Sequence, residues 1–103
     1  MPYVPQERRK RIDAAVRDLV AAIIIEHNRI DHKGSGEAAC LTTKAGLLNY
    51  AITKTILSLM GDPCYWKFPL LKGILRDVID EFNRKVVAKY EDAKAIENGE
   101  VYP

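Results

Sequence analysis

The stretch from Lys44 to Met60 constrains the fold of this chain more than any other. It contains no acidic residue, and its only charged side chains belong to Lys44 and Lys54. At 100° per residue, its apolar side chains divide between two sides of a helix: Ala45, Leu48, Ile52, Ile56 and Leu59 on one, and Leu47, Tyr50 and Leu57 roughly opposite. A helix that is apolar on both sides requires neighbours on both sides. We therefore predict that this stretch is the central helix of a small bundle.

Two amphipathic patterns flank the central helix. One runs from about residue 5 to about residue 27, with apolar residues at steps of three and four: Ile12, Ala15, Val16, Leu19, Val20, Ile23 and Ile24. The other starts at Pro69 and continues to Asn98–Gly99, with a stripe of Leu71, Ile74, Leu75, Val78, Ile79, Phe82, Val86, Tyr90 and Ala93. The sequence therefore predicts an all-α fold, a three-helix antiparallel bundle with a long C-terminal helix, in a single domain of residues 1–103.

The connections carry residues typical of turns and helix ends. Gly34–Gly36 is predicted to be a flexible connection, and Glu37–Leu41 to add a short helical turn. Thr42 or Thr43 is predicted to cap the central helix, because a threonine hydroxyl accepts the free N–H groups of a first turn. Gly61 follows the last apolar residue, so the helix is predicted to stop there.

The third helix is too long for a monomeric bundle. About 28 residues at 1.5 Å per residue give about 42 Å, whereas a compact domain of 100 residues has a radius of gyration of about 13 Å. Two interpretations follow: the helix kinks near Val87–Ala88, or its far half, with Tyr90, Ala93 and Ile96, packs on a second chain. We favour a homodimer, which the two-sided central helix also indicates.

Composition and charge narrow the function only slightly. The 103 residues carry a net charge of +2, too small to indicate a polyanionic partner by itself. We find no signal sequence and no apolar run of about 18 residues, which predicts a cytoplasmic protein without a membrane span. Cys40 and Cys64 have no metal-binding or C-x-x-C spacing, so we expect reduced thiols.

A compact basic patch of Arg8, Arg9, Lys10 and Arg11 opens the first helix. These residues are candidates for phosphate binding, and a nucleic-acid complex made through them would depend on salt. Acidic residues dilute the patch, and no helix-turn-helix accompanies it. An alternative use is pairing across an antiparallel dimer with the acidic residues of the tail, Glu91, Asp92, Glu97 and Glu100.

Two pairs of residues have the spacing of metal ligands. His27 and Asp31 share a helix face at i, i+4. Asp77 and Asp80 have the i, i+3 spacing of the magnesium-binding carboxylates in helical nucleotide pyrophosphohydrolases, but the stretch between Leu41 and Gly61 offers no facing acid. We interpret both pairs as solvated helix surfaces and predict no metal and no cofactor. No phosphate loop or nucleophile motif is present, so catalysis is the less favoured class.

Three aromatic residues, Tyr65, Trp66 and Phe68, lie within four positions of the second connection. We expect them to cover the open end of the bundle, with an exposed stacking surface as the alternative. Val101 and Tyr102, near the C-terminus, are expected to dock back onto the bundle.

Asn49 and Thr53 lie one turn apart on the apolar central helix, beside Tyr50. Buried amide and hydroxyl groups need partners, so we expect a hydrogen bond to a neighbouring helix or loop. Two alternatives stay open: these residues specify the register of an oligomer, or they line a small pocket with Tyr90.

Four segments resemble an uncharacterised family of short all-helical proteins from prokaryotes and their phages: Met1–Pro5 with Glu7–Arg9, Gly46–Thr53, Glu81–Val87, and Tyr90–Tyr102. The chain departs from that pattern at Leu47, Asn83 and Glu100, where the family more often has an acid, a tyrosine and an aspartate. The resemblance implies an all-helical fold and no established activity. It marks eight polar-site candidates: Asn49, Tyr50, Thr53, Tyr90, Glu91, Asp92, Lys94 and Asn98.

Two interpretations of these candidates stay open. In the one we prefer, the tail motif caps the third helix and docks the last residues; in the other, Asn49 and Tyr50 meet residues 90–94 across a subunit boundary. The sequence as a whole predicts a small, non-catalytic, oligomerising interaction or accessory protein. We expect a homodimer, with a different protein as an additional partner that the sequence leaves open. The alternatives are a nucleic-acid-associated protein and, third, a metal-dependent nucleotide hydrolase.

Overall fold

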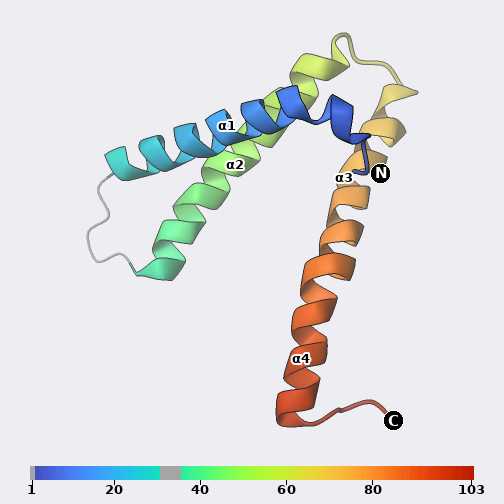
Figure 1. Cartoon of the computed structure of the whole chain (residues 1–103). Coiled ribbons are helices and arrows are strands. Elements are labelled where there is room, and N and C mark those ends of the chain that lie inside the picture. The colour runs from blue at the N-terminus through green and yellow to red at the C-terminus, as the bar shows by residue number, and fades with distance from the viewer. Residues whose placement is uncertain (1, 31–35) are drawn as a thin grey trace. The chain divides into compact units, whose positions relative to one another are not determined.

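The computed structural model describes residues 2–30 and 36–103, and every regular element in them is a helix (Figure 1). The 3-10 turn η1 (Gln6–Arg8) leads into α1 (Lys10–Arg29), and α2 spans Glu37–Met60. The long third helix consists of α3 (Lys67–Phe82), the π-helical segment η2 (Asn83–Val87) and α4 (Ala88–Asn98), which follow one another directly. The predicted all-α fold with a long last helix is confirmed.

The chain divides into two compact units. The hairpin unit, Val4–Asp62, contains α1 and α2, which pack on each other and run in opposite directions (Figure 1). The C-terminal unit contains Pro63–Pro103 together with Pro2 and Tyr3. The helix Lys67–Asn98, called here the C-terminal helix, is thus described in a unit of its own. Its predicted packing on α1 and α2, in a single three-helix bundle, stays a prediction.

The second helix begins earlier than the sequence indicated. It starts at Glu37, with Gly36 in extended conformation before it, so the predicted caps at Thr42 and Thr43 are wrong. The physical reason is the composition of residues 37–41, which contain two alanines and a leucine and therefore favour continued helix over a threonine cap. The connection predicted at Gly34–Gly36 lies largely outside the described residues.

Both predicted helix stops are confirmed. Gly61 follows α2 with φ of 66°, and its N–H donates to the carbonyl of Leu57. Gly99 follows α4 with φ of 95°, and its N–H donates to the carbonyl of Ala95 at 2.9 Å. Side chains other than glycine are strained at such positive φ values, which is why glycine ends both helices.

The described residues contain no buried apolar side chain. Only His27, in the last turn of α1, is buried, with 5% of its surface exposed. On α2, Leu48, Ile52 and Leu57 each keep about half of their surface exposed. Within the hairpin unit, α1 is the one helical neighbour of α2, and the predicted central position of α2 in a three-helix bundle stays a prediction. None of the helices in the described segments has the length and apolar character that crossing a membrane requires.

Candidate interaction surface

A row of exposed apolar side chains follows the C-terminal helix. Ile74, Val78, Phe82, Val86 and Tyr90 lie at four-residue steps along it, and each leaves 51–61% of its surface exposed. Soluble proteins rarely leave such a contiguous apolar stripe in water, since apolar surface is stabilised by burial. This stripe is therefore a candidate interaction surface.

The π-helical segment reduces the rotation of the stripe between Phe82 and Tyr90. A four-residue step exceeds the 3.6-residue turn of an α-helix, so each step rotates the next side chain by about 40° around the axis. Two consecutive steps, from Phe82 through Val86 to Tyr90, would carry Tyr90 off the stripe. The segment Asn83–Val87 has wider turns, with hydrogen bonds to the fifth residue, and reduces this drift. It ends at Val87, where the sequence analysis placed a possible kink.

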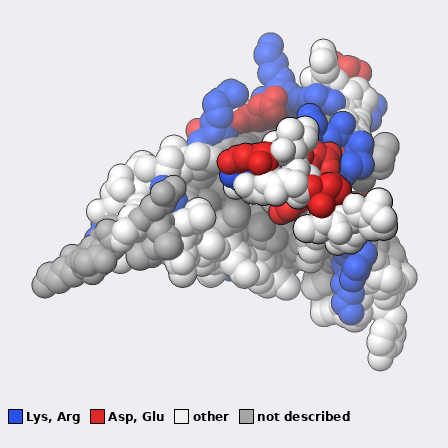
Figure 2. All heavy atoms as spheres, turned by 90° about the horizontal axis from the view of Figure 1, so that it is seen from below, with Lys and Arg blue, Asp and Glu red and all other residues white. Residues whose placement is uncertain are grey.

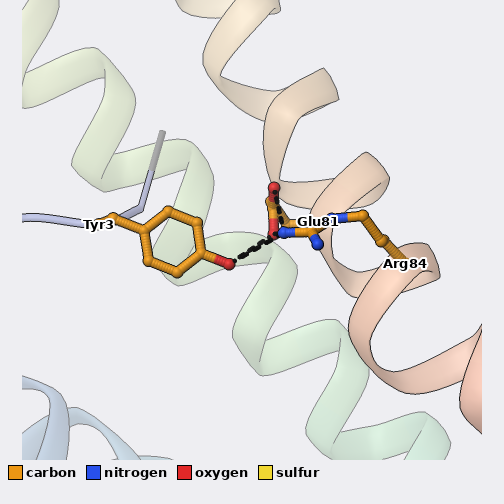
Figure 3. A network of polar contacts seen from close by, with 3 residues as sticks. All are labelled: Tyr3, Glu81 and Arg84. Atoms are coloured by element: carbon orange, nitrogen blue, oxygen red, sulfur yellow. Dashed lines mark hydrogen bonds and ion pairs between the residues drawn. The ribbon is translucent and has the colours of Figure 1, made fainter.

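A polar cluster fixes the N-terminal residues on the C-terminal helix (Figure 3). The Tyr3 hydroxyl donates to Oε2 of Glu81 at 3.0 Å. The Arg84 guanidinium donates to the same carboxylate at 2.9 Å and to the Tyr3 hydroxyl at 3.1 Å. These bonds join residues 78 and 81 positions apart in the sequence.

The cluster also shifts the acid–base equilibria of two of its members. The hydrogen bond from Tyr3, and then that from Arg84, holds the pKa of Glu81 below its ordinary value, because both donors favour the charged carboxylate. The pKa of Arg84 is raised, mainly by its hydrogen bond to Glu81. Sequence reasoning missed this cluster, although Tyr3 and Glu81–Val87 both lie in the segments that carry the family resemblance.

The eight polar-site candidates are divided between the two units. Asn49, Tyr50 and Thr53 lie on α2 of the hairpin unit, and all three are exposed. The Thr53 hydroxyl donates to the Asn49 carbonyl at 2.9 Å, one turn back in the same helix. The expected bond from Thr53 to another helix or loop is therefore wrong, since a threonine in a helix satisfies its hydroxyl on its own backbone.

The other five candidates lie on α4. The Lys94 ammonium lies 5.7 Å from the ring centroid of Tyr90 and forms an ion pair with Glu97 at 3.2 Å. Glu91, Asp92 and Lys94 line a shallow hollow with the tail, and Asn98 is the last residue of the helix. That these five meet the residues on α2 stays a prediction.

The tail and the aromatic segment are more exposed than expected. Val101 and Tyr102 keep 85% and 78% of their surface exposed, so they do not dock on the C-terminal helix, and their docking onto α1 and α2 stays a prediction. Tyr65 and Trp66 keep 91% and 67% exposed, and Tyr65 contacts Phe68 edge to face. These rings precede or open α3 and cover no apolar core, because the described residues contain none; the alternative of an exposed aromatic surface fits better.

The basic patch contains two kinds of side chain. Arg8, Lys10 and Arg11 are exposed and line a shallow hollow at the start of α1. Arg9 is less exposed, and its Nε donates to the carbonyl of Val4. Three of the four predicted phosphate-binding residues are therefore available to a ligand, while Arg9 holds the preceding turn. In the view of Figure 2, basic and acidic groups are interspersed on one part of the surface, and another part shows few of either.

The described residues do not bring the candidate metal ligands together into a metal site. Asp31 lies outside the described residues. His27 is buried, with 5% of its surface exposed, so its interpretation as part of a solvated helix surface is wrong. Asp77 and Asp80 lie on α3, and within residues 2–30 and 36–103 no three His, Cys, Asp or Glu side chains form a group suited to a metal. Cys40 and Cys64 are free thiols, as predicted.

The fold defines a small all-helical protein, and within residues 2–30 and 36–103 its apolar side chains are largely exposed. The chain belongs to the family described as Domain of unknown function (DUF6899), whose model matches residues 1–101. The match confirms the uncharacterised family that the sequence resemblance indicated and covers nearly the whole chain. Neither the curated proteins nor the solved structures contain a match to it.

Proposed function

We propose that this DUF6899 protein is a small, non-catalytic accessory protein of the cytoplasm that works as a homo-oligomer. The observation that carries the proposal is the absence of any buried apolar side chain in the described residues, with thirty large apolar residues exposed. Since burial of apolar surface is the main force that holds a fold together, these faces need a partner.

The surface area supports the same conclusion. The chain exposes 9258 Å². Two separately compact bodies with the sizes of the hairpin and C-terminal units would together expose about 7,000 Å². The excess is about 2,000 Å² per chain, or about 4,000 Å² for two chains, which falls in the range of obligate homodimer interfaces.

Light scattering after size exclusion tests this function directly. We expect a particle of at least twice the 11.6 kDa chain mass, at low and at high salt, because apolar burial dominates the contact. A monomer at every concentration would refute the proposal, since the apolar faces would then be covered within one chain.

A second candidate function rests on the three available cations of the basic patch. A nucleic acid bound there would be held through its phosphates and released by salt. The structure provides a matched control: Arg8→Ala and Arg11→Ala would each weaken gel retardation, whereas Arg9→Ala would leave it nearly unchanged, because Arg9 is hydrogen-bonded to Val4. Equal losses from all three substitutions, or no retardation at low salt, would count against this function.

A further inference from the structure

We infer that the C-terminal helix pairs with the same helix of a second copy, antiparallel, about a two-fold axis near Phe82. This inference rests on the proposed self-association and specifies its partner surface and geometry. The helix Lys67–Asn98 is the element to consider, because within its unit it has no second helix to cover its stripe.

The apolar stripe is symmetric about Phe82. In an antiparallel pair with its axis at residue 82, each residue faces the one at the same distance on the other side of Phe82. This places Val78 against Val86 and Ile74 against Tyr90, while Phe82 faces its own copy. All five side chains are more than half exposed, so the pairing covers the most exposed part of the stripe.

The charges beside the stripe select the antiparallel direction. Two lysines near the start of the helix have acidic counterparts at similar distances beyond Phe82: Lys67 and Glu97 lie 15 residues before and after it, and Lys72 and Glu91 lie ten before and nine after. An antiparallel pair therefore brings each lysine to an acid of the other copy.

A parallel pair in register would have the opposite effect. It would place each charged residue beside its own copy, Lys72 against Lys72 and Glu91 against Glu91, and like charges at such positions are destabilising.

The N-terminal anchor leaves the stripe accessible. Residues that share a helix face are three or four positions apart, so Arg84, two positions after Phe82, points to another side. Tyr3 is bonded to Arg84 and Glu81 (Figure 3), and neither of these residues belongs to the stripe. We expect a second helix to approach Phe82 without displacing this cluster.

Single-cysteine crosslinking tests the geometry. The background is the full chain with Cys40→Ser and Cys64→Ser, and the reagent is a short bismaleimide. We expect Phe82→Cys to crosslink to its own copy, because it lies at the axis. Ile74→Cys should not, since sixteen residue rises, about 24 Å, separate it from its copy in an antiparallel pair. Co-expressed Ile74→Cys and Tyr90→Cys chains of different tag length should crosslink to each other.

The other outcomes of crosslinking and light scattering would refute the antiparallel direction, the interface or the self-association separately. Crosslinking of Ile74→Cys to its own copy would refute the antiparallel direction. A dimer in light scattering with no crosslink at Phe82→Cys would refute this interface and leave the proposed self-association intact. A monomer in light scattering would refute both. Retained dimer mass in each cysteine variant shows that the substitution has not itself disrupted assembly.

Discussion

The two units expose apolar residues for different reasons. In the hairpin unit, α1 and α2 cover each other on one side, so that Ile23 and Ile56 are half-buried while their other sides stay exposed. In its own unit the C-terminal helix has no helical neighbour, and Phe82 and Tyr90 keep 59% and 61% of their surface exposed. The comparison indicates that α1 and α2 gain some burial from each other, whereas in the proposed dimer the C-terminal helix would gain its burial from the second copy.

The largest expected effect comes from a charge at the centre of the stripe. Phe82→Asp would place a carboxylate from each copy at the two-fold axis, where neither has a partner. We expect the dissociation constant to rise at least about thirty-fold, from the roughly 2 kcal/mol that defines an interface hot spot. Analytical ultracentrifugation measures the change.

A matched control separates this effect from that of added charge. Ile96→Asp introduces the same group on α4, at a residue that is 87% exposed and outside the stripe. Its dissociation constant should stay close to that of the unaltered chain. If both substitutions weaken dimer association equally, the added charge acts on the helix as a whole and not on the stripe.

A smaller effect is expected from the charges beside the stripe. In the Lys72→Glu variant, the new glutamate would face Glu91 of the other copy, and the two-fold axis gives two such contacts in each dimer. Since an exposed ion pair contributes about 0.2–1 kcal/mol, we expect association to weaken several-fold. The double variant Lys72→Glu with Glu91→Lys should restore it, and Lys54→Glu on α2 is the charge-matched control. Failure of the double variant to recover would contradict the antiparallel pairing, and high salt should reduce all of these differences.

Glycine substitutions distinguish stability from association. A Cβ added at Gly73, within α3, meets no other atom within 4 Å. Gly73→Ala should therefore raise the free energy of unfolding by about 0.5–1 kcal/mol. Its dissociation constant should stay the same, because residue 73 is half a turn away from the Phe82 side of the helix.

Gly61 provides the contrast in the hairpin unit. Its φ of 66° is unfavourable for alanine, so Gly61→Ala should lower stability by about 1–2 kcal/mol. Urea unfolding followed by circular dichroism measures both variants. A loss of stability in Gly73→Ala would mean that the solvated side of α3 is packed in solution.

The smallest expected effect concerns the N-terminal anchor and pH. The pKa of Glu81 is lowered in the folded chain, so its contribution is present at neutral pH and is lost as the pH falls through that lowered value. The ring proton chemical shifts of Tyr3 should then move toward those of an unbonded tyrosine. In Glu81→Gln they should have moved already at neutral pH, and Tyr65, which is 91% exposed, serves as the reference.

Particular residues show how far the sequence could predict this molecule. The helix ends at Gly61 and Gly99 were predictable, because positive φ is a local property of the backbone. The start of α2 was placed too late, because a possible cap at Thr42 competed with the strong helix preference of the preceding residues. The Tyr3, Glu81 and Arg84 cluster was not predictable from spacing, because its ends are nearly the whole chain apart.

By itself, the sequence determined the three helices, their amphipathic stripes and the family, because periodicity and glycine placement act within a few residues. Only the tertiary structure decided that these stripes stay exposed, that Tyr3 is held by Glu81 and Arg84, and that a π-helical segment reduces the rotation of the stripe between Phe82 and Tyr90. The physical reason is that periodicity indicates which side of a helix requires burial, whereas the residues that cover it depend on contacts between segments distant in sequence.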